Sequence, residues 1–317
     1  MNLTQKIFIL LLCLPSGTLL LLHVFGLSTM FDAGLWLFLP CTVLLAGLIF
    51  IKNSFIPDEV KLCIKLGVWG GLLGTFGYDL IRIPFALMGL KVFLPISVYG
   101  IWITDYAYSG FLTELVAWTY HFSNGITFGI MYALFMRKKH WIWGVVWAFV
   151  LETIVVLSPF SGIFGLTGNY TALGIAYLGH IAYGIPLGWV VMKSESLKIK
   201  NWMKTAGVIG LCGFFVLSIF VPRVTTKKEK NFVIFEPTKV SPKIIRSVKG
   251  KKLIIHNNSQ TSVTINSALV KKNITLNTND KKSVTLNNTG IYILEFKPDT
   301  GRATSGFVIV EPVLNSY

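Results

Sequence analysis

Two histidines lie in apolar stretches of the chain, and the same pattern follows each of them. His121 and His180 both begin the sequence His-x-x-x-Gly-Ile-x-(Phe or Leu)-Gly. On a helix, positions i, i+4 and i+8 share one face, so each histidine is expected one turn from a pair of glycines that lets membrane helices approach closely. Because an ionisable side chain inside a membrane is a candidate functional residue, the repeat indicates a duplicated helix pair that carries a site.

Other polar side chains lie in the neighbouring apolar stretches. A rise of about 1.5 Å per helical residue places them between the middle and one face of a membrane. These residues are Asp79, Arg82, Glu114, Asn124, Glu152 and Tyr183. Since a charged group that faces lipid is costly, we expect them to point at one another and to form one polar site with the two histidines.

Three kinds of chemistry fit this set. In the first, His121, His180 and Glu152 bind zinc or iron, or the two histidines bind haem, and a bound metal activates water. Glu152 or Asp79 then serves as general base, and Arg82 holds an anionic group such as a lipid phosphate. In the second, the acidic and histidine groups conduct protons or ions through a transporter. In the third, the cluster only holds the helices together, with Asp79 and Arg82 as an ion pair one turn apart.

The inner halves of the same stretches favour a site that opens to one side. Residues 126–136, 143–148 and 187–191 offer no polar relay, whereas a transport path needs polar groups at both ends. The leading interpretation is an outward-open site, possibly metal-assisted, in an enzyme that acts on a lipid or lipid-linked envelope molecule. The alternatives are a transporter and a non-catalytic membrane scaffold whose outer domain binds a partner.

The composition is that of a membrane protein. Of the 317 residues, 53% are hydrophobic and 14% are charged, and the mean hydropathy is +0.64. A hydrocarbon layer of about 30 Å takes about 20 apolar residues to cross. Seven stretches of about this length predict an all-α bundle of seven transmembrane helices over residues 1–221. They are residues 7–26, 33–51, 62–90, 112–136, 141–163, 171–192 and 203–221.

The positive charges predict an orientation. Lysine and arginine cluster in the loops at residues 52–65, 137–139 and 193–204, while the loops between them carry a single cation. Because cations are retained on the cytoplasmic side, the amino terminus is predicted in the cytoplasm and the part after residue 221 outside the cell membrane of a bacterium. The aromatic connection 91–111 is expected at the outer face of that membrane.

The chain changes character after residue 221. This part has sixteen Lys and Arg against six Asp and Glu, and no cysteine. Residues 222–236 predict a charged linker, and residues 237–317 show period-two runs at the spacing of a β-sandwich. Such a basic domain beside a membrane favours membrane lipids, an envelope protein or an anionic polymer as partner, rather than nucleic acid. The predicted strands are residues 252–256, 262–266, 272–276, 282–286, 290–296 and 306–310.

The last part of the chain resembles a cupredoxin, the Greek-key sandwich of blue-copper proteins. The matching pieces are residues 250–258, 290–292 and 306–310. The copper ligands do not carry over, since other residues stand where the family has its cysteine and histidines. These residues are Phe296, Asp299 and Thr261 or Ser262. A blue-copper centre needs a thiolate and two imidazoles, so the resemblance implies the fold without blue copper, as a recognition or spacer module. An immunoglobulin-like sandwich is the alternative fold.

Overall fold

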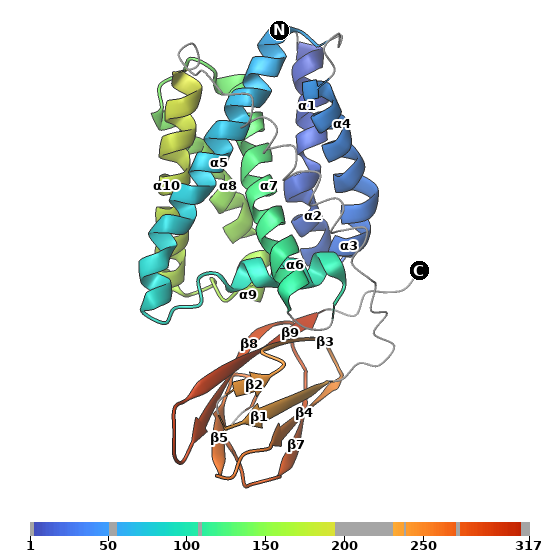
Figure 1. Ribbon diagram of the computed structural model, residues 1–317, viewed down its shortest axis with the longest axis vertical. Coiled ribbons are helices and arrows are strands. Elements are labelled where there is room, and N and C mark those ends of the chain that lie inside the picture. The colour runs from blue at the N-terminus through green and yellow to red at the C-terminus, as the bar shows by residue number, and fades with distance from the viewer. Residues whose placement is uncertain are drawn as a thin grey trace.

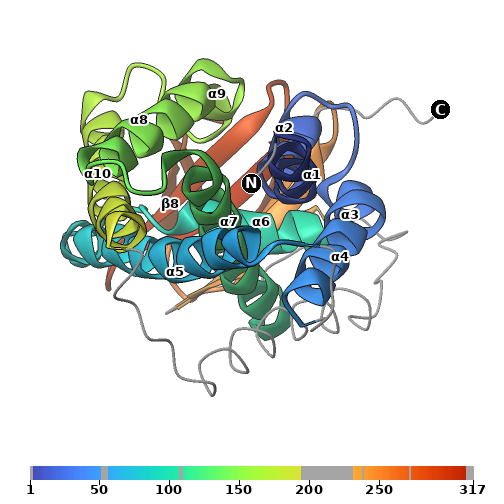
Figure 2. The ribbon, with the colours of Figure 1, turned by 90° about the horizontal axis from the view of Figure 1, so that it is seen from above.

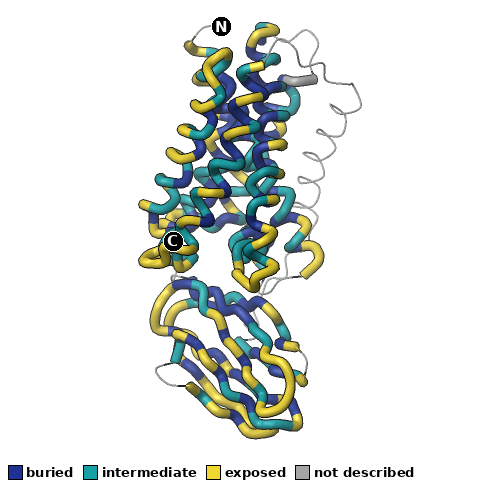
Figure 3. The backbone as a smooth tube through the Cα atoms, turned by 90° about the vertical axis from the view of Figure 1, so that its left-hand side faces the viewer, coloured by how far each residue is buried: buried dark blue, intermediate teal, exposed yellow. Residues whose placement is uncertain are grey.

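The computed structural model describes residues 3–50, 56–106, 110–193, 231–237, 239–270 and 273–311. A helical domain is followed by a β domain, and the two lie end to end (Figure 1). Buried residues run through the interior of both domains (Figure 3). The predicted order of an apolar helical part and a β-sandwich is confirmed. The predicted helix 203–221 and most of the predicted linker lie outside the described residues.

Long helices and short connecting helices make up the first domain. The bounds are α1 (Leu3–Cys13), α2 (Pro15–Val24), α3 (Met30–Ala33), the π-helix η1 (Gly34–Phe38), α4 (Leu39–Phe50), α5 (Asp58–Leu87), α6 (Leu94–Thr104), α7 (Phe111–Met136), α8 (Ile142–Leu157), α9 (Phe160–Ile163) and α10 (Tyr170–Met192). The asparagine that precedes α10 caps it, since the Asn169 side chain accepts a hydrogen bond of 3.0 Å from the Ala172 amide.

Three of the described helical stretches are long and apolar enough to cross a membrane, namely Met30–Leu48, Asp58–Leu87 and Tyr170–Met192. A fourth is added if α1 and α2, which meet at 47°, count as one bent span. The 26-residue α7 falls short because polar side chains lower its hydropathy, and α8 has only 16 residues. The chain is therefore membrane-associated, with three to four clear spans among the described residues.

Four long helices of the helical domain, α5, α7, α8 and α10, are in direct backbone contact. Helix α5 packs against both α7 and α10, and α10 also packs against α8 (Figure 2). A Cβ atom on Gly67 would lie 2.3 Å from the Ile130 Cα, and one on Gly77 would lie 2.5 Å from the Ala182 carbonyl oxygen. Only glycine allows such an approach, so these glycines fix how closely the helices pack.

The β domain is a sandwich of two sheets. Their strand orders are β2-β1-β4-β7 and β3-β9-β8-β5-β6, with parallel pairs at β1/β4 and β3/β9 and antiparallel pairs elsewhere. The bounds are β1 (Phe232–Glu236), β2 (Lys239–Ser241), β3 (Ile244–Val248), β4 (Lys252–Asn257), β5 (Val263–Asn266), β6 (Ile274–Leu276), β7 (Lys281–Thr285), β8 (Gly290–Pro298) and β9 (Thr304–Glu311).

The six predicted strands are all present as β4 to β9, with shifts of a few residues at their ends. The sequence analysis does not predict β1, β2 or β3. The five residues of β1 follow a charged run and fall in the predicted linker. Alternate side chains of β1 enter the core, where the Phe235 and Phe296 rings stack with centroids 5.3 Å apart. Phe296, which stands in place of the copper-binding cysteine of a cupredoxin, is thus a core residue.

Strand β9 is buried on both faces. Val308 and Val310 lie in the core of the sandwich. Phe307 and Ile309 pack instead with residues of the helical domain, Trp102 among them. The five-stranded sheet therefore lies against the helical domain, and the four-stranded sheet lies on the far side.

An ion-pair network, buried except for the exposed Asp105 carboxylate, joins the two domains. The Arg246 guanidinium donates through Nε to Glu311 Oε1 at 2.7 Å and also binds Asp105, the residue after α6. The Nε2 atom of His23 lies 3.8 Å from the same Glu311 oxygen. Burial raises the pKa of Glu311, although the Arg246 charge acts in the opposite direction. Burial disfavours the charge on Arg246, but its two carboxylate partners raise its pKa overall.

Replacing Gly71 tests the backbone contacts. We expect Gly71→Ala to lower the free energy of unfolding by about 1–3 kcal/mol, because a Cβ atom there would lie 2.4 Å from the Gly125 carbonyl oxygen. Gly174→Ala on α10 is the control, since its Cβ would meet nothing within 4 Å. Thermal unfolding of the detergent-purified protein measures both variants. Equal stability of the two would contradict the proposed packing role.

Replacing Arg246 tests the domain contact. Arg246→Met leaves Glu311 and Asp105 without their cation, and removal of one partner from a buried pair costs about 3–5 kcal/mol. We expect a lower unfolding temperature than for Arg302→Met, which removes an exposed arginine of the same domain. Unfolding followed by tryptophan fluorescence compares the two variants. A loss of stability no greater than that of Arg302→Met would show that the network does not hold the domains together.

Candidate functional site

The first histidine of the repeat pairs with a carboxylate on α5. The Nε2 atom of His121 lies 3.0 Å from each carboxylate oxygen of Asp79. Gly125, one turn along from His121, packs against Gly71 of the same α5 helix. If Asp79 is ionised it can only accept, so Nε2 carries the proton and Nδ1 of a neutral His121 remains an acceptor.

The second histidine pairs in the same way with a carboxylate on α8. The Nδ1 atom of His180 lies 3.3 Å from Glu152 Oε2 and 2.9 Å from the Ala176 carbonyl oxygen. Because a carbonyl oxygen only accepts, Nδ1 carries the proton and Nε2 is the acceptor of a neutral imidazole. Gly184, one turn along from His180, packs against Gly144 of the same α8 helix.

The two pairs are therefore built alike. In each, a histidine lies four residues before a glycine, that glycine packs on a glycine of the partner helix, and the carboxylate follows this second glycine by eight residues. Eight residues are little more than two helical turns, so the carboxylate lies on the same helix face as this second glycine. There it is beside the histidine of the neighbouring helix. The sequence pattern predicted the repeat in the two helices that carry the histidines. The structure shows that the two helices that carry the carboxylates repeat as well.

Two side chains of α5 connect the pairs. The ring of Tyr78 contacts both imidazoles, with centroids 6.0 Å from that of His121 and 5.0 Å from that of His180. The Arg82 guanidinium lies over the Tyr78 ring at 4.7 Å and over the Phe93 ring at 4.8 Å. Its Nη1 atom is 3.6 Å from Asp79 Oδ1. The sequence did not single out Tyr78, because an aromatic ring in an apolar helix is ordinary core material.

Together these side chains form one polar layer across four helices, which we call the paired-histidine layer: Tyr78, Asp79, Arg82, His121, Glu152 and His180. Helix α5 ends, and α7 and α10 begin, on the side of the helical domain nearer the β domain (Figure 1). The layer residues Asp79, His121 and His180 are closer in sequence to these ends than to the opposite ones, so the layer lies toward that side. The side chains of Asp79, His121 and His180 remain 12%, 14% and 18% exposed. Both pairs are therefore mostly buried, and a small part of each imidazole is exposed.

Three further predicted site residues lie apart from these pairs. Asn124 accepts a hydrogen bond of 2.9 Å from the Ser16 hydroxyl of α2. The Tyr183 hydroxyl donates to the Gly125 carbonyl oxygen at 2.6 Å. Glu114 lies in the first turn of α7 and is half-buried. Asn124 and Tyr183 connect neighbouring helices, which is a structural role.

The structure does not support the predicted metal centre. Among the described residues, no group of three or more His, Cys, Asp or Glu is placed to hold a metal ion. Of the three predicted ligands, His180 and Glu152 are in contact, whereas His121 pairs with Asp79 of another helix. The Tyr78 ring contacts both imidazoles, where the haem alternative would need open space between them. Zinc, iron or haem at these residues stays a prediction.

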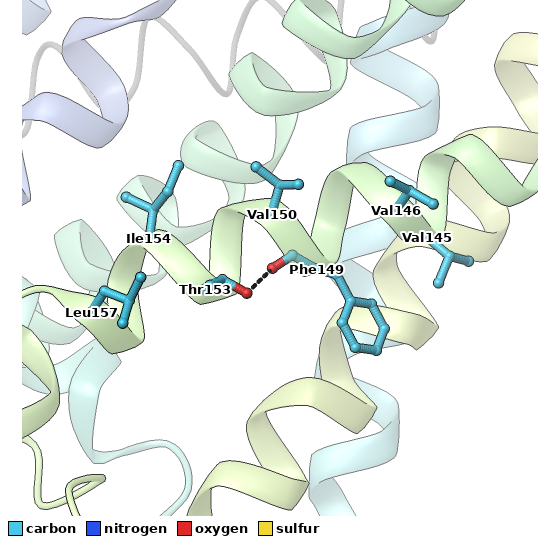
Figure 4. Close-up of a pocket in the computed structure, with 7 residues that line it drawn as sticks. All are labelled: Val145, Val146, Phe149, Val150, Thr153, Ile154 and Leu157. Atoms are coloured by element: carbon cyan, nitrogen blue, oxygen red, sulfur yellow. Dashed lines mark hydrogen bonds between the residues drawn. The ribbon is translucent and has the colours of Figure 1, made fainter.

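An apolar groove of about 480 Å³ runs along the exposed face of α8 (Figure 4). Within it, the Thr153 hydroxyl donates to the Phe149 carbonyl oxygen at 2.8 Å. Its lining residues carry no ionisable group: Val145, Val146, Phe149, Val150, Thr153, Ile154 and Leu157. In a membrane this face would meet lipid chains, and it is separate from the paired-histidine layer.

Comparison with known proteins concerns the β domain. No protein-family model matches the chain, and no curated protein matches it. A solved structure described as a novel purple cupredoxin from Nitrosopumilus maritimus is 21% identical, and the match covers 25% of this chain and 98% of that chain with a TM-score of 0.20. The β domain resembles a cupredoxin. The likeness predicted from the sequence is thus also found by structural comparison, and it concerns the fold alone.

A double-mutant cycle tests the first pair. We expect Asp79→Asn and His121→Ala each to lower the free energy of unfolding by about 1–3 kcal/mol, and the double variant to lose less than the sum. Coupling of about 0.5–3 kcal/mol is usual for residues in contact. The control cycle combines Asp79→Asn with His140→Ala, an exposed histidine. Additive losses in both cycles would show that Asp79 and His121 do not interact.

Proposed function

We propose that the helical domain is a membrane-embedded acid–base catalyst that acts on a lipid or a lipid-linked envelope molecule. The carrying observation is the pair of imidazole–carboxylate contacts that share the Tyr78 ring. A carboxylate orients an imidazole and stabilises its protonated form, and the second ring nitrogen then exchanges protons with a reactant. Two such pairs side by side supply both partners of a general acid–base reaction.

The two pairs take complementary roles in this proposal. His121, held by Asp79, removes a proton from the attacking water or hydroxyl group through Nδ1. His180, in its protonated form beside the Glu152 carboxylate, gives the Nε2 proton to the leaving group, and the proton taken up by His121 returns to solvent before the next turnover. The Arg82 guanidinium is fixed between two aromatic rings and provides the positive charge that an anionic head group needs near the reacting bond.

The proposed topology makes this site face outward. In it the chain crosses a bacterial cell membrane seven times, with the amino terminus in the cytoplasm and the β domain outside. The cation-rich loops support this orientation, and the α5, α10 and Met30–Leu48 spans support the membrane location. Because the paired-histidine layer lies in the half nearer the β domain, it would then sit at the level of the outer leaflet.

Transport fits the packing less well than catalysis. Farther from the β domain, backbone contacts between glycines close the spaces between α5, α7, α8 and α10, as at Gly67 and Gly188. A scaffold remains the second candidate, since each charged group of the layer already has a partner inside the protein. In that case the pairs would contribute stability alone.

Lipid turnover distinguishes the two candidates. Purified protein is placed in vesicles made from the total lipids of the producing bacterium, and lipid species are followed by mass spectrometry. We expect the wild type to consume at least one species, and His121→Asn and His180→Asn each to slow this by about 10²–10⁴-fold. The exposed His140→Asn is the control and should keep full activity.

The thermal unfolding of each variant is measured in parallel, so that loss of catalysis is separated from loss of folding. Unchanged lipids with wild-type protein, or equal turnover by all variants, would reject the catalyst and favour the scaffold.

A further inference from the structure

The outer face of the four-stranded sheet is basic and faces away from the helical domain. The opposite sheet packs on the helices through Ile244, Phe307 and Ile309, so this face points away from the protein's own membrane domain. Lys252 and His256 alternate with core residues along β4, and Lys281 lies beside His256 on β7. Lys282 of the edge strand β7 is exposed too, but it pairs with the core residue Ile255 and is therefore not part of this face.

The lysines of this face are not neutralised by nearby carboxylates. Within the described part of the chain, Lys252 and Lys281 take part in no ion pair. The Glu236 carboxylate, on β1, is already paired with Lys239 at 3.3 Å. Asp280, beside Lys281, accepts a hydrogen bond of 2.9 Å from the Asn277 amide. The face therefore carries a net positive charge that a ligand can neutralise.

Apolar side chains lie between the cations. The Phe232 ring contacts the His256 ring at 5.8 Å and lies 5.9 Å from Lys281 Nζ. Ile254, the neighbour of Phe232 across the sheet, is 38% exposed. Aromatic and aliphatic surface flanked by lysines suits a sugar chain, since the ring faces pack on apolar groups while anionic substituents meet the ammonium groups.

We propose that this face, defined by Phe232, Lys252, Ile254, His256 and Lys281, binds an anionic polysaccharide of the cell envelope. Its charge complements a polyanion, and its direction favours a polymer beyond the membrane over the lipid head groups beside the helices. Its cations and apolar side chains are spread over β1, β4 and β7, so an extended chain that makes repeated weak contacts is the fitting ligand. This proposal does not depend on the catalytic one.

Binding of polygalacturonate, a carboxylate-bearing polysaccharide, tests it with full-length protein in detergent micelles. We expect binding at about 0.1 M salt that weakens as the salt rises, because added ions screen exposed charges. The double variant Lys252→Gln, Lys281→Gln should bind about tenfold more weakly. Phe232→Ala should also weaken binding, because the ring supplies the contact with the sugar.

A matched double variant removes the same charge elsewhere in the domain, at the exposed Lys249 and Lys297. It should bind polygalacturonate as the wild type does. An equal loss of binding in both double variants would show that only net charge matters and would overturn the proposal. The proposal would also be overturned if the wild type did not bind polygalacturonate, or if it bound neutral dextran equally well. Stronger binding to vesicles with anionic lipids would overturn it too, because a lipid surface would then be the ligand. Unfolding temperatures confirm that each variant is folded.

Discussion

Direct backbone contact between helices is the constraint on which the helical domain depends. Where Gly71 meets Gly125 and where Gly144 meets Gly184, a side chain on either helix would push the pair apart. If the helices moved apart at these glycines, each histidine would also move away from its carboxylate, which lies about two turns from the glycine of its own helix. The glycines thus set the geometry of the ion pairs, although none of them takes part in the chemistry.

The histidine repeat could be predicted from the sequence, whereas the pairing of each histidine with its carboxylate could not. The histidine repeat is visible because its spacing recurs within one helix, and an apolar background makes each imidazole conspicuous. Which carboxylate each histidine meets depends on how helices lie beside one another, and no spacing along the chain records that. The predicted metal site grouped His121 and His180 by residue type, whereas in the structure each is paired with a carboxylate of a different helix.

The β domain shows the same limit. Strands with strict alternation, such as β4, were predicted closely, because one face enters a core and the other meets solvent. The short β1 was taken for linker, since few residues separate it from a charged run. The contact of Arg246 with Glu311 and Asp105 was unforeseen, because these residues come from three distant parts of the chain and carry no shared motif.

The double burial of β9 has a consequence for the β domain as a unit. Side chains of β9 pack in the core of the sandwich and also against the helical domain. The β domain would therefore expose apolar side chains if it were separated from the helices. The severed fragment would present Phe307 and Ile309 to water beside a charged residue that has lost one of its counter-ions. Such a fragment would be prone to self-association, so the β domain is better regarded as the lid of the helical domain than as a separable appendage.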